Sequence, residues 1–420
     1  MTQRPFPVTG KRWVEQSSHR HWLLSQAERL FDFYQPRVLN PKGGFFDLDD
    51  RGEPLPTGWP PASRPTTNLF QTTRMVHCFA IGHLMGRPGS IELVDHGVRH
   101  LWDVHRDRKN GGYFWQNALT EPHESSKQHY GHAFVLLAAS SAKVAGHPDA
   151  DRLLADITEV LEKRFWEEER GAGAEEFSAD WEPLGTYRGQ NSNMHLTEAL
   201  MAAFEATGER EYLRKAESVA DLLINRITRG NSWRLPEHFN EDWSIDFAYD
   251  RDVFRPFGST IGHWLEWTRL ILQLWELGGR TSPWMLDAAK QLFALSVAEG
   301  WSAERGGFYF TVGWDGKPVD RDRYWWPCTE GIGAASFFNA IAGDELYEGW
   351  YRRIWDWSSR HLIDHERGGW FHQLNDDLER IQDPWYGKPD IYHSLQACLI
   401  PLLPTGGSVT AGLVNHGIRL

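Results

Sequence analysis

A phrase of two glycines followed by two aromatic residues recurs along this sequence. The four copies stand at 42–47 (KGGFFD), 110–115 (NGGYFW), 305–310 (RGGFYF) and 367–372 (RGGWFH). Their spacing corresponds to units of roughly 65 residues if two degenerate copies lie in the long interval between the second and third. GAEEFS at 173–178 and LPEHFNEDW at 235–243 are aromatic-bearing segments at the expected places, without the glycine pair. Self-similarity at a fixed period predicts a repeat architecture, with six units over nearly the whole chain.

Between these phrases the hydrophobic pattern is helical. In residues 191–208 the apolar side chains recur every three or four positions, and Gly208 ends the pattern. Residues 209–227 repeat the pattern with a charged opposite face, which is typical of a partly exposed outer helix. Residues 258–279 are apolar on nearly all sides, which predicts a buried helix. Each unit is therefore predicted to contain one buried and one half-exposed helix, joined by a glycine-aromatic turn.

Six such pairs most economically close into a ring, an (α/α)6 toroid lined by the buried helices. An open solenoid is the alternative, but the sequence has no obvious polar capping repeats. We therefore expect an all-α fold in which residues 1–420 form a single toroidal domain. The glycine pairs are expected to form tight turns, and the aromatic residues after them to wall one mouth of the ring.

The charge and cysteine content narrow the range of partners. The net charge is −13 and basic residues form no run, which argues against nucleic acid or an anionic membrane surface as a partner. Residues 1–13 contain no apolar leader segment, and no stretch approaches 18 consecutive apolar residues. Cys78, Cys328 and Cys398 are too few and too far apart for a disulfide framework, so we expect a cytoplasmic protein. The oligomeric state is left open.

Several common catalytic motifs are absent from the sequence. There is no GxGxxG after a strand, no P-loop, no HExxH and no GxSxG. The i, i+4 carboxylate and histidine spacing of ready-made metal sites is also missing, although the histidines as a group leave a metal site open. We therefore expect no cofactor and no metal. The 22 Trp and 22 Phe residues suit either an ordinary core or the lining of a sugar site.

Four histidines lie near the start of a predicted inner helix, just after a loop. They are His132, His195, His263 and His393. Each alone is more typical of a structural histidine, but the helix ends that share one mouth of a toroid converge on one cavity. A helix N-terminus lowers the pKa of an imidazole and keeps it neutral, as a general base must be. We therefore expect at least two of the four to be catalytic.

Two further side chains are candidates for the same site. Glu266 shares a helix face with His263, so it is expected either to orient His263 or to bind a hydroxyl group. Arg74 lies on another apolar helix, after Asn68 as a candidate helix cap. A buried arginine needs an anionic partner or a ligand oxygen, and a structural ion pair is the competing interpretation.

These segments resemble the N-acylglucosamine 2-epimerase superfamily of (α/α)6 sugar epimerases and isomerases. The likeness covers almost the whole chain and is carried by TTRMVH, MGRPGSIELVDHG, KQHYGHAFVLLAASSA, YRGQNSNMH, FGSTIGHWLEW and GKPDIYH. It looks closest to the aldose–ketose isomerase branch that acts on mannose and on sulfoquinovose. The resemblance implies that His263 and His393 are the acid/base pair, and that His195 assists ring opening and holds the sugar. It also implies substrate contacts from Arg74, Tyr130, Asn191, Glu266 and Trp326.

The implied reaction moves a proton between C2 and C1 of a sugar through a cis-enediol. One imidazole removes the C2 proton, the other handles protons at the sugar oxygens, and the arginine stabilises the enediolate. This route needs no redox cofactor, whereas a hydride shift needs two divalent metals. We expect D-mannose and D-fructose as the substrate pair. Pro389 stands where sulfosugar isomerases carry a glutamine, which disfavours sulfoquinovose, and a sugar 2-epimerase remains an alternative because the same histidines serve both outcomes.

Two hypotheses lie outside this family. An (α/α)6 toroid also suits an inverting glycosidase that uses two carboxylates. The candidate carboxylates are Glu175, Glu176, Glu237 and Asp242. An aromatic-lined sugar-binding module without catalysis is the second hypothesis. The convergence of histidines favours the isomerase over both.

Overall fold

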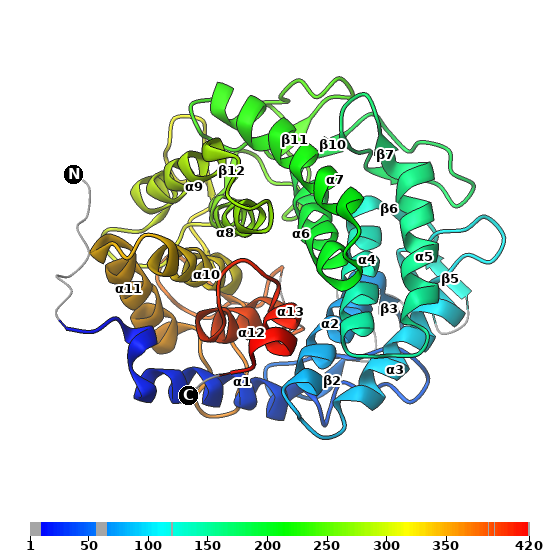
Figure 1. Ribbon diagram of the computed structural model, residues 1–420, viewed down its shortest axis with the longest axis horizontal. Helices are drawn as coiled ribbons and strands as arrows, with labels where there is room; N and C mark the ends of the chain where they lie inside the picture. The colour runs from blue at the N-terminus through cyan, green and yellow to red at the C-terminus, as the bar shows by residue number, and fades with distance from the viewer. Residues whose placement is uncertain (1–9, 56–64, 119–120, 385, 390, 419–420) are drawn as a thin grey trace.

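The helices of this protein form a closed ring of two layers (Figure 1), as the repeat predicts. The structure is a computed structural model, and it describes residues 10–55, 65–118, 121–384, 386–389 and 391–418. Asp390 of the GKPDIYH segment lies outside the described residues.

Six helices line the inside of the ring. They are almost wholly buried, because each packs against its neighbours in the ring and against the outer layer. In α8 every residue from Ile261 to Leu274 is buried, as the all-round apolar pattern predicts. Gly208, at φ 79°, ends α6 where the sequence placed the stop. The inner helices are α2 (Leu69–Leu84), α4 (His129–Val144), α6 (Gln190–Thr207), α8 (Ile261–Leu277), α10 (Trp325–Ile341) and α12 (Tyr392–Leu399).

Six outer helices cover this lining, and each buries one face only. Several of them end in a short π-helical turn before the chain reaches the next hairpin. The outer helices are α1 (Ser17–Tyr34), α3 (Ser90–His100), α5 (Ala150–Val160), α7 (Arg210–Ala220), α9 (Pro283–Leu295) and α11 (Glu345–His361). The π-helical turns are Leu101–His105, Leu161–Phe165, Asp221–Thr228 and Ser296–Gly300, and 3-10 turns span Trp13–Glu15 and Ile400–Leu402.

The two ends of the chain close the ring. The N-terminal helix α1 packs against α12 near the C-terminus, and the two lie side by side in Figure 1. The backbone N–H of Lys388, just before α12, donates to the carbonyl oxygen of Leu48 at 2.8 Å. The first and last units are therefore joined in the same way as consecutive units are.

Short antiparallel strands join the units at the end of the ring where the inner helices begin. A strand directly before an inner helix pairs with the strand that follows the next glycine turn, for example Lys127 opposite Phe177. The strands are β1 (Asp47–Leu48), β2 (Pro54–Leu55), β3 (Thr67–Asn68), β4 (Gln116–Ala118), β5 (Glu121–Glu124), β6 (Lys127–Gln128), β7 (Trp166–Glu167), β8 (Ala172–Gly173), β9 (Glu176–Phe177), β10 (Arg188–Gly189), β11 (His238–Phe239), β12 (Ser259–Thr260), β13 (Thr311–Val312), β14 (Arg323–Tyr324) and β15 (Gln373–Leu374). They pair as β1–β2, β3–β4–β5, β6–β9, β7–β8, β10–β11, β12–β13 and β14–β15.

The glycine pairs form the predicted turns. Gly111 and Gly112 have φ angles of 76° and 75°, a region that is costly for residues with a Cβ. The Asp107 carboxylate caps this turn by accepting from the backbone N–H of Lys109 and Asn110. The two degenerate hairpins turn at Gly171 (φ 71°) and at 232–233 (φ 55° and 65°), a few residues before the segments that the sequence suggested.

The sequence predicts that the aromatic residues after the glycines wall one mouth of the ring. The structure shows that not all of them do so. The first aromatic of each phrase is buried between the two helix layers, as Tyr113 and Phe308 illustrate at 0% exposure. The Tyr113 hydroxyl donates to Asp156 of α5 at 2.8 Å. These aromatics therefore fix the turn to the core.

A last helix, α13 (Val409–His416), packs against α2, α4 and α6. The backbone N–H of Ser408 donates to the carboxylate of Glu205, in the last turn of α6. The helix therefore covers the ring at the end opposite to the strands.

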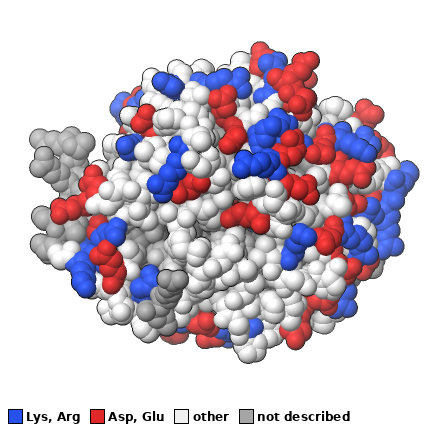
Figure 2. Space-filling model, viewed as in Figure 1, with Lys and Arg blue, Asp and Glu red and all other residues white. Residues whose placement is uncertain are grey.

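The outer surface shows no strong charge segregation on the face in Figure 2, where acidic and basic side chains are interspersed. Within the described ranges, no helix is long and apolar enough to cross a membrane.

Candidate active site

Three of the predicted histidines lie together at the strand end of the ring. His195, His263 and His393 stand in the first two turns of α6, α8 and α12, and each is at most 8% exposed. The indole of Trp326, the second residue of α10, lies 5.0 Å from the His263 ring and 5.8 Å from the His393 ring, centroid to centroid. The structure therefore brings His263 and His393 to one half-buried aromatic ring.

His263 is held by a buried carboxylate. Its Nδ1 lies 2.8 Å from Oε2 of Glu237, which also accepts from the side-chain amide of Gln190 at 2.8 Å. The other Glu237 oxygen accepts from the backbone N–H of Thr260 at 3.0 Å. Burial raises the pKa of Glu237, but His263, His238 and the hydrogen bond from Gln190 together bring it below its usual range. The ionised carboxylate keeps the proton on Nδ1 and leaves the Nε2 lone pair of His263 for the substrate.

This partner differs from the one that the sequence suggested. Glu266 was expected either to orient His263 or to bind a hydroxyl group. Glu237 orients His263 from the hairpin before α8, and the hydroxyl contact of Glu266 stays a prediction. One feature of the sequence could have indicated this partner of His263: the degenerate copy of the repeat contains an acidic residue, Glu237. Helical spacing favoured Glu266 because it considers only one helix at a time.

His393 is held in the same way by Glu330 of α10. Its Nδ1 lies 2.9 Å from Oε1 of Glu330, and Oε2 of Glu330 accepts from Nε of Arg269 at 2.9 Å. Burial raises the pKa of Glu330, but the charge of Arg269 and the hydrogen bond from His393 bring it below its usual range. Sequence reasoning identified neither Glu330 nor Arg269.

Three buried carboxylates surround Arg269. Its Nη2 lies 3.5 Å from Glu198 and 3.6 Å from Glu266, in addition to the bond with Glu330. One guanidinium does not neutralise three carboxylates in a dry interior. Burial and the charges of Glu330 and Glu198 raise the pKa of Glu266 well above its usual range, which favours its protonated form.

The spacing of these groups resembles that of metal ligands. Possible ligand atoms of His195, Glu198 and Glu266, and of Glu266, Glu330 and His393, lie within 4.8 Å of one another. Sequence spacing gave no hint of this clustering. The cation that the three carboxylates hold is the guanidinium of Arg269, so we do not assign them as metal ligands.

His195 lies beside this cluster. Its Nδ1 is 3.6 Å from Glu198 and 3.7 Å from Glu266, and its ring meets the Tyr130 ring edge-on at 5.2 Å. Burial lowers the pKa of His195 to about 4, so its imidazole is neutral at physiological pH. The structure thus places the third predicted histidine next to two predicted substrate contacts, Tyr130 and Glu266.

Arg74 reaches the same region from α2. Its Nη2 donates to the Tyr130 hydroxyl at 2.8 Å, and its guanidinium lies 4.6 Å from the Phe134 ring and 4.9 Å from the Tyr392 ring. The expected helix cap before it is not formed as predicted, because the Asn68 side chain accepts a hydrogen bond from Gln116 of β4.

Asn191 is the second residue of α6, and its side chain has an unused acceptor. Its Oδ1 is buried and has no hydrogen-bond partner among the described residues. A buried acceptor without a partner is rare in a folded protein. This oxygen is therefore suited to accept from a bound hydroxyl group.

His132 does not join the site. Its Nε2 accepts from the backbone N–H of Tyr113 at 2.9 Å, and its Nδ1 donates to the carbonyl oxygen of Gln128 at 2.7 Å. Burial lowers its pKa to about 3. Both ring nitrogens of His132 are used by the backbone, so three of the four candidate histidines lie together, and the expectation that at least two of the four are catalytic stays a prediction.

The acids proposed for a glycosidase have other partners. Glu237 holds His263, Glu175 accepts from the Ser192 hydroxyl at 2.7 Å, and the exposed Asp242 accepts from the backbone of Ser244. Glu176 lies 3.7 Å from Arg255. These contacts do not favour a facing pair of catalytic carboxylates.

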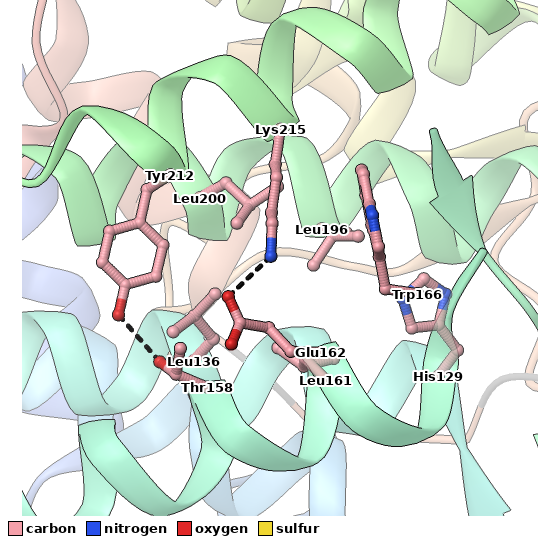
Figure 3. Close-up of a pocket in the computed structure, with 10 residues that line it drawn as sticks. All are labelled: His129, Leu136, Thr158, Leu161, Glu162, Trp166, Leu196, Leu200, Tyr212 and Lys215. Carbon is pink, nitrogen blue, oxygen red and sulfur yellow. Dashed lines mark hydrogen bonds and ion pairs between the residues drawn. The ribbon is translucent and has the colours of Figure 1, made fainter. Parts of the chain in front are cut away.

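A separate pocket lies between the helix layers, away from these histidines (Figure 3). Its polar side chains pair with each other: Lys215 with Glu162 at 2.6 Å, and Tyr212 with Thr158 at 2.8 Å. Its walls are mainly leucine and tryptophan, and none of the predicted site residues lines it. We therefore assign it to packing between the layers.

The chain is similar to one family profile and to several proteins of known activity. The sequence profile described as N-acylglucosamine 2-epimerase (GlcNAc 2-epimerase) matches residues 43–397. A D-mannose isomerase of Pseudomonas cannabina pv. alisalensis is 41% identical over 416 residues, which is 97% of this chain and 98% of that protein. A D-mannose isomerase of Thermobifida fusca is also 41% identical, over 96% of this chain and 99% of its own. A crystal structure of D-mannose isomerase superposes with a TM-score of 0.84 at 32% identity, covering 91% of this chain and 97% of that one.

Proposed function

Because this chain belongs to the N-acylglucosamine 2-epimerase family, we propose that it is a sugar isomerase that interconverts D-mannose and D-fructose. Relatives that cover nearly its whole length at 41% identity are D-mannose isomerases. The observation that carries the proposal is the pair of histidines, His263 and His393, each held at Nδ1 by a buried glutamate and both next to the Trp326 ring. Two such imidazoles suit the two proton transfers of an aldose–ketose conversion.

The sugar is proposed to lie against the indole of Trp326, with its C1–C2 edge between the two histidines. The flat face of a sugar ring packs well on an aromatic ring. Asn191 accepts from a sugar hydroxyl through its buried Oδ1, and Glu266, whose Oε1 is also buried without a hydrogen-bond partner among the described residues, contacts a second sugar hydroxyl. His195, neutral beside Tyr130, takes the ring hydroxyl proton when the cyclic sugar opens.

The isomerisation then needs two proton exchanges that balance. One of His263 and His393 removes the proton from C2 through Nε2 while the other, as imidazolium, gives a proton to the aldehyde oxygen O1. The product is a cis-enediol. The second imidazole next takes the O2 proton, the first returns its proton to C1, and the sugar becomes D-fructose. Arg74, which donates to the Tyr130 hydroxyl, is proposed to stabilise the negative charge that builds on the sugar oxygens.

Two related activities use the same groups. A 2-epimerase returns the proton to C2 on the opposite face, and the proposed residues serve that outcome equally. For a sulfosugar, Pro389 has no side-chain donor for a sulfonate, and its backbone carbonyl accepts from the side-chain amide of Gln71. The missing side-chain donor at Pro389 favours an unsubstituted hexose.

The test is proton NMR of the EDTA-treated protein with D-mannose in D2O. We expect fructose to form with deuterium at the exchanged carbon, and His263→Ala and His393→Ala to reduce the rate by at least about 10³-fold. The control His416→Ala, at an exposed position at the end of α13, should leave the rate unchanged. Glucose as the first product would indicate an epimerase, and turnover of sulfoquinovose without mannose would show that the Pro389 argument is wrong.

A further inference from the structure

Arg269 is the centre of the buried polar network beneath the proposed active site. The side chain is 2% exposed, and it contacts carboxylates from three different inner helices. Gly333 of α10 leaves space for it, because a Cβ at that position would meet Cδ of Arg269 at 3.0 Å. Because Arg269 is buried, contact with solvent does not account for a charged side chain at this position.

Its strongest contact leads directly to one histidine. Nε of Arg269 donates to Oε2 of Glu330 at 2.9 Å, and the other oxygen of Glu330 lies 2.9 Å from Nδ1 of His393. All three side chains are at most 5% exposed. The chain of contacts Arg269–Glu330–His393 therefore spans α8, α10 and α12 and ends at the Nε2 of His393.

The protonation of Glu330 decides which nitrogen of His393 carries the proton. An ionised Glu330 only accepts, so Nδ1 holds the proton and Nε2 has a free lone pair. A protonated Glu330 donates to Nδ1, and the proton of the neutral imidazole then moves to Nε2. In that state His393 has no lone pair with which to accept a proton from the substrate.

The partner of His263 has no comparable cation. Glu237 accepts from the backbone of Thr260, the amide of Gln190 and His263 itself. Among the described residues Glu330 has no neutral donor of this kind, and its second oxygen is bound to Arg269. The two histidines thus depend on different means of keeping a buried carboxylate ionised.

We propose that Arg269 is a positioning residue for His393, which acts through Glu330 to keep the Nε2 of His393 free as a proton acceptor. This inference rests on the proposed isomerase function, and it adds a residue that does not touch the sugar. The guanidinium fixes the orientation of Glu330 by a charged hydrogen bond and supplies the positive charge that keeps Glu330 ionised.

The other ionisable groups around this chain bear on its titration. The raised pKa of Glu266 favours its neutral form, and His195 stays neutral above about pH 4. Burial raises the pKa of Glu198, but the hydrogen bond with His195 and the charge of Arg269 bring it below its usual range. The charged and titratable side chains that face Arg269, Glu330 or His393 are His195 and Glu198 of α6, Glu266 of α8, Tyr392 of α12, and Arg74 and His77 of α2.

The test compares Arg269→Met and Arg269→Lys with the matched control Arg323→Lys. Arg323 is also fully buried, but it binds the glycine turn at Gly306 and Asp376. In Arg269→Met we expect the acid limb of the pH profile of kcat/KM for D-mannose to move up by about one to three pH units, because a cation next to Glu330 is lost. In Arg269→Lys, which keeps the charge but not the fork, we expect kcat to fall about 10²-fold at little changed KM. Arg323→Lys should keep the wild-type profile.

A second readout needs no substrate. Nitrogen-15 NMR of histidine-labelled protein reports the tautomer of His393, whose signal is identified by its absence in His393→Asn. We expect the Nδ1–H tautomer in the wild type and a shift to Nε2–H in Arg269→Met. A folded Arg269→Met with the wild-type tautomer and pH profile overturns the proposal. If Arg269→Met does not fold, wild-type kcat and tautomer in Arg269→Lys overturn it instead. Absence of mannose turnover in the wild type would refute the isomerase function while leaving the tautomer result to judge Arg269.

Discussion

At the scale of single residues, the site depends on how each imidazole is held. His263 and His393 each have Nδ1 bound by a carboxylate, which leaves Nε2 for the substrate. His132 occupies a similar place at the start of an inner helix, but both of its nitrogens bond to backbone groups. The contacts of a histidine, more than its position in the repeat, therefore separate a catalytic role from a structural one.

Glu237→Gln tests the role of the carboxylate beside His263. The amide cannot hold the proton on Nδ1 as firmly, and the neutral side chain no longer stabilises an imidazolium. We expect kcat for mannose isomerisation to fall about 10²-fold or more, with KM changed only a few-fold. Steady-state kinetics measure this, and Asp242→Asn, in the same loop but exposed, is the control. An unchanged kcat in a folded Glu237→Gln would remove Glu237 from the mechanism.

At the scale of elements, two buried lysines anchor glycine turns of the ring. Lys127, the first residue of β6, is fully buried, pairs with Asp107 at 2.8 Å and donates to the carbonyl oxygen of Gly111 at 2.6 Å. Lys388 makes the same pair of contacts with Asp364 and with the carbonyl oxygen of Gly368. The glycine turns are thereby anchored next to the starts of the inner helices, where the proposed site lies.

The last helix is anchored by an acid with a raised pKa. Burial raises the pKa of Glu205, which accepts from the Ser408 backbone before α13, to about 7. Since the unfolded chain has the lower pKa, the folded state binds the proton more tightly. The stability from this group is complete below about pH 4.5 and is lost as the pH rises through about 7.

Glu205→Gln should therefore stabilise the protein at alkaline pH. The amide keeps an acceptor for Ser408 without carrying a charge. We expect the free energy of unfolding at pH 8.5 to rise by about 1 to 3 kcal/mol relative to the wild type, with a smaller difference at pH 5. Urea unfolding at both pH values measures this, and Glu209→Gln, exposed just after α6, is the control. An equal effect at both pH values would contradict the assignment.

At the scale of the whole molecule, the ring closes without free ends. α1 packs on α12, and Lys388 bonds to Leu48, so each unit has two neighbours. An open array of repeats unfolds by loss of its terminal units, whereas a closed ring has none to lose. We propose on this basis that the 420 residues form one domain.

This proposal predicts a single cooperative unfolding transition. Urea curves from far-ultraviolet circular dichroism and from tryptophan fluorescence should coincide. Leu30→Ala truncates a buried side chain of α1. It should move both curves to lower urea concentration together and reduce the free energy of unfolding by about 2 to 5 kcal/mol. Leu346→Ala, at a position that is 45% exposed on α11, should have little effect. Separate transitions for the two probes would contradict a single domain.

The sequence by itself determined the architecture and four candidate histidines near the starts of inner helices, and the family resemblance narrowed these to three. Gly208 ended α6 where the pattern stopped, and the apolar run around His263 became a buried inner helix. These features follow from local chemistry, since a period of glycines and apolar residues is written along one stretch of chain. The expected substrate contacts Arg74 and Tyr130 lie together, and their roles remain predictions.

Only the tertiary structure decided what holds those histidines. Glu237 and Glu330 come from other units of the ring, 26 and 63 residues away from His263 and His393. Arg269 joins carboxylates of three helices, so its surroundings exist only when the ring is closed. Burial then makes these partners matter, because an isolated charge in a dry interior is costly and each acid must find a donor or keep its proton. Spacing along one helix contains no information about contacts between helices. It therefore suggested Glu266 as one candidate to orient His263, whereas the folded protein uses Glu237.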